Sequence, residues 1–152
     1  MILNSNFKTA VMTSYIKAAV TASLCQYSQA YSQKDVKMLL AITDPDYLGF
    51  GSGPDEQVTS RSELQRHLER DFAQSDELSM HFGPISIAYA GDVAWCAGEC
   101  VIEAEAGGTR QRLTGRMTAV LRKRGDEWLF AHTHFSLPDR GQENGKSFPE
   151  KK

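Results

Sequence analysis

The sequence predicts a single α+β domain whose helices cover one face of a curved antiparallel sheet. Apolar residues recur at helical spacing near the N-terminus, whereas residues 93–137 alternate between apolar and polar side chains. That alternation is interrupted at Gly107-Gly108 and at Gly125-Asp126. Because glycine and aspartate tolerate the positive φ of two-residue hairpin turns, these residues are predicted to form a three-stranded meander.

Three helices are predicted ahead of the meander. In residues 8–33, apolar side chains recur every three or four positions, which indicates one long helix with residues 1–7 as a loose lead. Asp35 can cap a short second helix over residues 36–42. A Ser-x-x-Glu capping box begins a third helix over residues 60–74.

Shorter stretches complete the sheet. Residues 47–51 are rich in aromatic side chains and predict a brief strand, and residues 51–56 form a loop by composition. Residues 78–89 alternate as a further strand. A bulge is predicted at Gly83-Pro84, since proline cannot donate a hydrogen bond to the neighbouring strand.

Length and composition narrow the possible functions. The chain has 152 residues, enough for one domain, which we assign to residues 8–138. Residues 139–152 lack an apolar stripe and are predicted to be a flexible tail. With a formal net charge of −2 and scattered lysines and arginines, the chain is expected to bind neither nucleic acid nor a membrane. The N-terminal apolar residues are interrupted by polar ones, so no membrane span is predicted.

The cysteines indicate the redox environment. Cys25, Cys96 and Cys100 form an odd set without metal-ligand spacing. On one strand, Cys96 and Cys100 would lie roughly 13 Å apart, too far for a disulfide. A reducing, cytoplasmic location is therefore expected.

The first hairpin turn fixes a register, because a two-residue loop pairs the residues that flank it. Pairing Ala106 with Thr109 places three charge pairs on one face of the sheet: Glu99 with Arg116, Glu103 with Arg112, and Glu105 with Arg110. The other face carries small or apolar residues, namely Ala94, Cys96, Gly98, Cys100, Ile102, Ala104, Leu113, Gly115, Met117, Ala119 and Leu121.

Four stretches of the chain resemble a known superfamily. They are Gly-Phe-Gly-Ser-Gly-Pro-Asp-Glu at 49–56, Gly-Asp-Val-Ala-Trp at 91–95, Arg-Met-Thr-Ala-Val at 116–120, and Trp-x-x-x-His-x-His-x-Ser at 128–136. With the order of elements, they make the chain similar to SnoaL-like proteins of the nuclear transport factor 2 superfamily. The chain also resembles the association domain of calcium/calmodulin-dependent protein kinase II. The resemblance implies a cone-shaped, cystatin-like fold but no single reaction, because isomerases, cyclases, dehydratases, hydrolases and scaffolds share it.

Two departures from the family pattern bear on the site. Ketosteroid isomerases of this superfamily use a carboxylate on the first short strand, yet residues 47–51 contain no acid. The association domain supplies pocket arginines from positions that here carry Glu99, Val101 and Phe135. Arg116 is then the cation that remains for a pocket.

Glu99 and Arg116 are predicted cross-strand partners, and Trp95 and Thr118 share their face. If that face lines the cone, these four residues form a ligand-binding pocket suited to a small polar or anionic organic molecule. The alternative is a structural ion pair, like the two pairs nearer the hairpin turn.

His132, His134 and Ser136 project from one side of the last strand. Two histidines at this spacing could ligate a metal, but no third ligand is evident, so no metal site is predicted. A structural histidine or a general base fits better. Tight pairing across the second hairpin turn places His134 beside Met117, which separates the histidines from Arg116 unless a bulge intervenes.

These patterns favour a small-molecule-binding protein of the SnoaL-like type. Tyr31 and Tyr47 are further ligand-binding candidates, although tyrosines on an apolar stripe also serve as core residues. One alternative is a cofactor-free isomerase, cyclase or dehydratase with Glu99 or His134 as the proton-transfer group. Another is an oligomerisation module. No phosphate-binding glycine motif occurs and no cofactor is predicted, whereas the small apolar face is expected to pair two copies as the outer sheet face of a homodimer.

Overall fold

A computed structural model describes residues 2–148, including the side chains of residues 8–148. Within this range the helices are α1 (Ile2–Ser32), α2 (Val36–Ala41) and α3 (Arg61–Ala73). The strands are β1 (Thr43–Phe50), β2 (Gln57–Val58), β3 (Glu77–Ala90), β4 (Val93–Ala106), β5 (Thr109–Arg124) and β6 (Glu127–Ser136).

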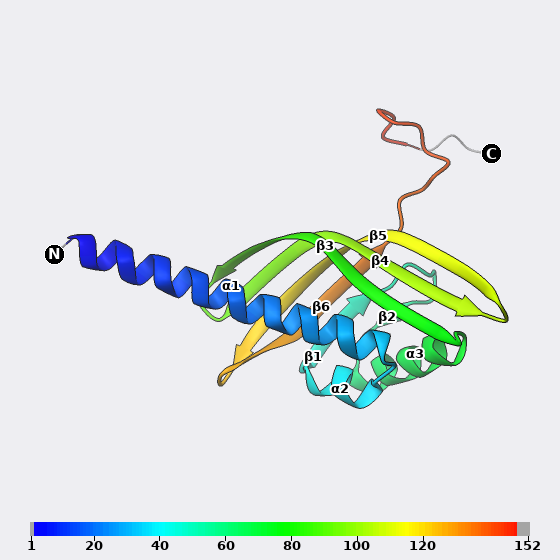
Figure 1. The fold of residues 1–152 in the computed structure, drawn as a ribbon, viewed down its shortest axis with the longest axis horizontal. Helices are drawn as coiled ribbons and strands as arrows, with labels where there is room; N and C mark the ends of the chain where they lie inside the picture. Colours follow the sequence, from blue (N-terminus) through cyan, green and yellow to red (C-terminus); the bar gives the residue numbers. More distant parts are fainter. Residues whose placement is uncertain (1, 149–152) are drawn as a thin grey trace.

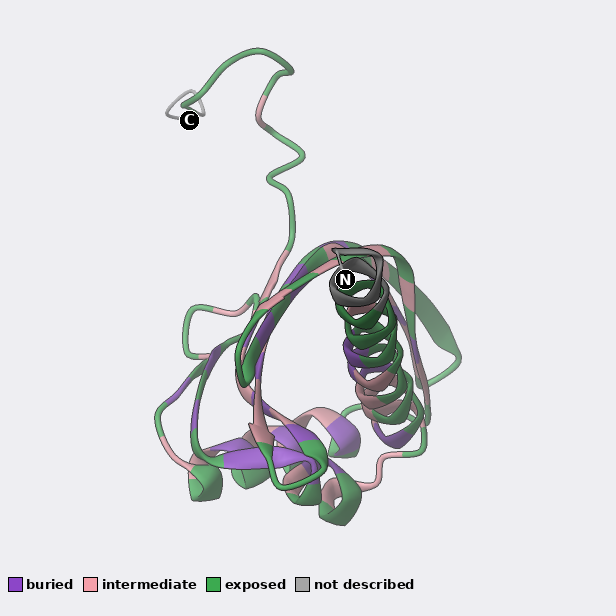
Figure 2. Cartoon of the chain, turned by 90° about the vertical axis from the view of Figure 1, so that its left-hand side faces the viewer, coloured by how far each residue is buried: buried purple, intermediate pink, exposed green. Residues whose placement is uncertain are grey.

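The six strands form one sheet in the order β2-β1-β6-β5-β4-β3. Neighbouring strands are antiparallel except β1 and β6, which run parallel. The sheet curls around α1, while α2 and α3 pack beside the C-terminal part of that helix (Figure 1, Figure 2). The predicted cone-shaped α+β fold is confirmed, with a mixed sheet in place of a wholly antiparallel one.

The concave face of the sheet forms the core with α1. Ile16, Val20 and Leu24 of α1 are buried against the sheet, and the small residues facing them are enclosed: Ala94, Cys96, Ala119 and Leu121. Because these side chains are short, α1 lies close to the strands. The curved sheet therefore encloses this face. The prediction that these small residues form an outer, dimer-forming face is therefore wrong.

The first helix is longer than predicted. It begins at Ile2, so the expected loose lead is wrong for residues 2–7, and Met1 lies outside the described residues. The N-terminal part of α1 extends beyond the sheet (Figure 1). Val11 and Met12 of α1 are exposed. After β6, residues 137–148 contain no helix or strand, and the mobility of the tail stays a prediction.

The predicted third helix and the bulge are both present. Ser60 caps α3, its Oγ accepting a hydrogen bond from the Glu63 N–H at 3.2 Å. The Glu63 carboxylate accepts from the N–H and hydroxyl of Thr59, one residue earlier than in the usual capping box. In β3, the register against β4 shifts between Phe82 and Ile85, around the predicted Gly83-Pro84 bulge.

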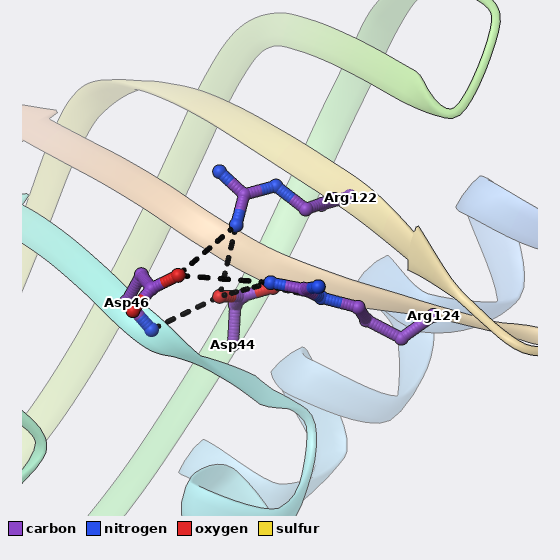
Figure 3. Close-up of polar contacts among 4 residues, drawn as sticks. All are labelled: Asp44, Asp46, Arg122 and Arg124. Carbon is purple, nitrogen blue, oxygen red and sulfur yellow. Dashed lines mark hydrogen bonds and ion pairs between the residues drawn. The ribbon is translucent and has the colours of Figure 1, made fainter.

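A buried carboxylate fastens β1 to β5 across the intervening β6 (Figure 3). Asp44 is fully buried and accepts hydrogen bonds from Arg124 Nε at 3.0 Å, Arg122 Nη1 at 3.3 Å and the Asp46 N–H at 3.0 Å. Burial alone would raise the pKa of Asp44, but these hydrogen bonds and the two guanidinium charges outweigh it and hold the pKa below its usual value.

Asp44→Asn should lower the free energy of unfolding at pH 7 by about 2 kcal/mol, because two guanidinium groups lose their shared carboxylate. A lowered pKa stabilises the fold above the unfolded value of about 3.9, and this contribution is lost as the pH falls through the folded pKa. Urea unfolding should therefore show the difference between wild type and variant at pH 7, and show it shrinking below about pH 3. Asp46→Asn is the matched control, since Asp46 is exposed and bridges the same arginines. An equal loss in both variants would contradict the special role of Asp44.

Candidate functional site: a cavity inside the cone

A cavity of about 420 Å³ lies inside the cone, between the helices and the concave face of the sheet. Aromatic side chains form much of its wall: Tyr27, Tyr31, Tyr47 and Phe135. Aliphatic side chains from β4 and β5 add Ile102, Ala104, Leu113 and Met117. Its charged and titratable lining comes from the loop after β1 and from α3, namely Glu56, His67 and Asp71. The cavity thus combines apolar walls with one polar side.

The three tyrosines are held by neighbouring rings and by the sheet. Tyr27 and Tyr31 stack with ring centroids 6.4 Å apart, and Tyr31 meets Phe72 edge-on at 5.2 Å. The hydroxyl of Tyr47 shares a 2.5 Å hydrogen bond with Thr133 Oγ1. Burial raises the pKa of all three hydroxyls, so they stay protonated near neutral pH and can donate hydrogen bonds.

One guanidinium organises the polar side of the cavity. Arg70 reaches Asp55 at 2.7 Å, Glu56 at 3.1 Å and Asp71 at 3.4 Å. Glu56 also accepts the Gly53 N–H at 2.7 Å, which folds the loop back toward α3. Three carboxylates share one arginine, so this side of the cavity carries excess negative charge.

Asp71 is the carboxyl of this group whose pKa is raised. Burial is the largest cause that raises its pKa, and the negative charge of Glu56 raises it further. The charge and hydrogen bond of Arg70 lower the pKa, but do not offset those two effects. His67 lies one turn earlier on α3 and also lines the cavity.

The structure places the predicted pocket residues on two different surfaces. Tyr31 and Tyr47 line the cavity, and their role in ligand binding stays a prediction. The remaining four lie on the convex face, where they are exposed and outside the cavity: Trp95, Glu99, Arg116 and Thr118. The predicted pairing of Glu99 with Arg116 is confirmed. Their placement inside the cone is wrong, because α1 packs on the opposite face of the same strands.

A bulge also moves the histidines. The register of β5 against β6 shifts at Ala131, so His132 lies opposite Val120 and His134 lies opposite Thr118. Tight pairing throughout was therefore wrong, and the histidines share the convex face with Arg116. There, Phe50 contacts both imidazoles at ring centroid distances of 6.3 and 5.5 Å. The proton-transfer candidates Glu99 and His134 thus lie outside the cavity.

Sequence reasoning missed the residues that form the polar side of the cavity. His67 and Asp71 are four positions apart and lie beside the apolar stripe of α3 formed by Leu64, Leu68 and Phe72. Polar residues beside an apolar stripe are ordinary in an amphipathic helix, so this pattern does not indicate that the two side chains line a cavity. Glu56 gives no signal in the sequence either, since only the fold of its loop directs it inward.

A model of the SnoaL-like domain family matches residues 20–140. The chain therefore belongs to the SnoaL-like family. No curated protein matches it.

Solved structures of the nuclear transport factor 2-like class share the fold. A candidate scytalone dehydratase from Novosphingobium aromaticivorans superposes with a TM-score of 0.78 at 16% identity, covering 86% of this chain and 89% of the other. A nuclear transport factor 2-like superfamily protein from Salmonella enterica serovar Typhimurium gives 0.78 at 19%, covering 90% and 99%. A candidate calcium/calmodulin-dependent protein kinase II association domain from Xanthomonas campestris gives 0.72 at 19%, covering 80% and 86%. At these identities the likeness shows the fold.

Asp71→Asn should stabilise the fold at neutral pH. A carboxyl whose pKa is raised in the folded state favours folding at low pH, and this benefit is lost as the pH rises through the raised pKa. Removing the ionisable group should therefore raise Tm at pH 7 by about 2 °C and leave Tm almost unchanged at pH 3. Differential scanning calorimetry at both pH values measures this. A lower Tm for the variant at pH 7 would mean that the Arg70 contact outweighs burial.

Proposed function

We propose that this protein binds a small organic molecule in the cavity inside the cone. The observation that carries this proposal is the cavity itself, whose volume of about 420 Å³ falls in the range of pockets for small ligands. Its aromatic and aliphatic walls suit an apolar body, and its tyrosine hydroxyls offer hydrogen bonds to a polar group.

The charges of the cavity bear on the polarity of the ligand. An anionic ligand was expected because of Arg116, but Arg116 lies on the convex face. The cavity instead presents Glu56 and Asp71, whose negative charges would repel an anion in a partly buried site. A neutral molecule is therefore the ligand we propose for the cavity.

A cofactor-free isomerase, cyclase or dehydratase is the second candidate. The solved structures that share the fold include the candidate scytalone dehydratase and a candidate dehydratase from Streptomyces avermitilis. Such a reaction needs a proton-transfer group beside the ligand, and Asp71 and His67 line the cavity. The enzyme hypothesis therefore moves from Glu99 and His134 to residues of α3.

We further propose that the protein forms a homodimer through the convex sheet face. This dimer is the form in which the protein would act as an oligomerisation module. Leu48, Phe50 and Trp95 expose about half of their surface on this face. Glu99 and Arg116 are paired in register, yet no ion pair joins them among the described residues. In a two-fold dimer the same patch meets itself, so Glu99 of one copy can reach Arg116 of the other. That charge complementarity supports a second copy as the partner.

We also propose a cytoplasmic location. All three cysteines are free, and burial raises the pKa of Cys96 and Cys100 to about 11, which keeps both as unreactive thiols. None of the helices in residues 2–148 combines the length and the apolar character that crossing a bilayer requires.

Filling the cavity should weaken ligand binding. Ala104→Phe adds a ring to the cavity wall and should weaken any ligand found by a thermal-shift screen by roughly tenfold or more. Ala88→Phe, on the convex side of β3, is the matched control and should bind normally. Isothermal titration calorimetry measures both. If Arg116→Ala abolishes binding while Ala104→Phe does not, the ligand site lies on the convex face and the proposal fails.

Placing a charge on the convex face should separate the dimer. Trp95→Glu buries a carboxylate at the proposed interface and should give a monomer by size-exclusion chromatography with light scattering. Met12→Glu, at an equally exposed apolar position on α1, should leave the dimer intact. A monomeric wild-type protein at micromolar concentration would refute the dimer.

A further inference from the structure

We propose that Ser75 is a specificity-determining residue of the cavity and that its hydroxyl binds a hydroxyl group of the ligand. The ligand class is then a neutral ring compound that carries an alcohol or phenol group. This inference rests on the proposed binding function of the cavity. It names the polar group that the cavity selects, and it requires no catalysis.

The hydroxyl of Ser75 is the observation that leads to this proposal. Ser75 lines the cavity, and its Oγ is buried. Within residues 8–148, whose side chains the structure describes, it is the one buried side-chain nitrogen or oxygen without a hydrogen-bond partner. Burying a hydroxyl without such a partner costs free energy, so native proteins rarely leave one unpaired. An unpaired hydroxyl in a cavity wall therefore indicates a contact that a bound molecule completes.

The backbone around Ser75 is held from two sides, which limits the movement of its hydroxyl. The Lys34 ammonium, on the turn after α1, donates hydrogen bonds to the carbonyl oxygens of Ser75 and Asp76. The Asp76 N–H donates to the Glu105 carbonyl oxygen at 2.6 Å, and the Asp76 carboxylate accepts from the Gly107 N–H at 2.9 Å. Because the loop is fixed between α1 and the β4–β5 hairpin, Ser75 is preorganised at the cavity wall.

The other uncharged polar residues of the cavity wall do not need a ligand as a partner. The Thr133 hydroxyl shares its hydrogen bond with Tyr47. Four more residues are exposed, so water can bond them: Ser52, Gln74, Thr109 and Gln111. Ser75 differs from them because its hydroxyl is both buried and unpaired.

Asp71 determines which polar group suits this part of the cavity. It lies four residues before Ser75 and also lines the cavity. Its Oδ1 receives a long contact of 3.4 Å from Arg70 Nε, and its Oδ2 accepts no hydrogen bond from the described side chains. An ionised carboxylate only accepts hydrogen bonds, whereas a serine hydroxyl can donate and accept.

A ligand hydroxyl meets both requirements, since it can donate to the Asp71 carboxylate and accept from the Ser75 hydroxyl. A ligand carbonyl has no proton to donate, so it would satisfy Ser75 and leave Asp71 without a donor. The cavity should therefore prefer an alcohol to a ketone of the same shape.

The walls of the cavity determine the rest of the ligand. Aromatic and aliphatic side chains such as Tyr27, Leu113 and Phe135 surround an apolar ring, and a negatively charged group would meet Glu56 and Asp71. The bicyclic alcohol 2-indanol combines a neutral apolar ring with one hydroxyl. It serves as the probe beside two compounds of nearly the same size. In 2-indanone a carbonyl replaces the hydroxyl, and indane has neither group.

The test compares the dissociation constants of the three probes for the whole chain at neutral pH, measured by titrating the methyl NMR signals of Met117 and Ala104. Wild-type protein should bind 2-indanol about tenfold more tightly than 2-indanone or indane. Ser75→Ala should remove most of this preference and leave the binding of indane unchanged. Ser86→Ala is the matched control, since Ser86 is an exposed serine on β3 outside the cavity and its variant should keep the wild-type preference.

A second measurement separates a ligand contact from a structural role. Ser75→Ala removes an unpaired buried hydroxyl, so it should raise Tm of the free protein by about 2 °C while it weakens the binding of 2-indanol. A residue that served only the fold would lower Tm and weaken the binding of all three probes together. Differential scanning calorimetry measures Tm, and a lower value for the variant would contradict the inference.

The inference is also overturned if wild-type protein binds 2-indanone as tightly as 2-indanol, or if Ser75→Ala keeps the preference for the alcohol. The binding function of the cavity stands in both cases. If none of the three probes shifts either methyl signal at millimolar concentration, the ring-alcohol class is overturned. The proposed binding function itself fails only if ligands found by screening remain bound when Ala104→Phe fills the cavity.

Discussion

The packing of α1 on one face of β4 and β5 is the contact on which the rest of the structure depends. Side chains alternate along a strand, so the helix selects every second residue for the interior and leaves the others outside. Small residues such as Ala94 and Ala119 let α1 lie close to the strands and draw the sheet into a cone. Nearer the hairpin turn, Leu113 and Met117 continue the same face, and there the helix no longer fills the space. The cavity is this unfilled part of the interior.

Two arginine-centred clusters close the cone around that cavity. Asp44, held by Arg122 and Arg124, ties β1 to the sheet across β6. Arg70 ties the loop after β1 to α3, and brings Glu56 to the cavity wall.

The two clusters shift the pKa of Asp44 and of Asp71 in opposite directions. In the first, two cations surround one buried carboxylate and lower its pKa, which gives stability. In the second, one cation serves three carboxylates, and Asp71 keeps a raised pKa beside the cavity. Carboxyl groups with a raised pKa are common at the functional sites of proteins.

Much of the fold was predictable because its signals are local. The alternation of β4 and β5 and the turn at Gly107-Gly108 fix a register that holds at every pair, including Glu99 with Arg116. The cap at Ser60 and the bulge near Pro84 are likewise set by neighbouring residues. The direction in which the sheet curves could not be predicted from local signals, because it depends on how α1 packs. Either face of the meander could have been the interior. Choosing the charged face put Trp95 and Arg116 in the pocket, whereas the structure encloses the small face.

The site was harder to predict because it assembles residues from separate elements. Tyr31 and Tyr47 were recognised individually, but their meeting with Asp71 needed the tertiary fold. The Ala131 bulge was likewise invisible to pattern reasoning, since a shift of one residue leaves the composition of β6 unchanged and yet reverses the face of His132 and His134.

Methyl NMR of a bound ligand tests the central claim, that the face covered by α1 is the binding face. Met117 and Ala104 report on the cavity, and Thr118 and Ala97 on the convex face of the same strands. Titration with a ligand from the thermal-shift screen should shift the methyl signals of Met117 and Ala104, and leave those of Thr118 and Ala97 in place. Shifts confined to Thr118 and Ala97 would contradict the account and return the site to Glu99 and Arg116.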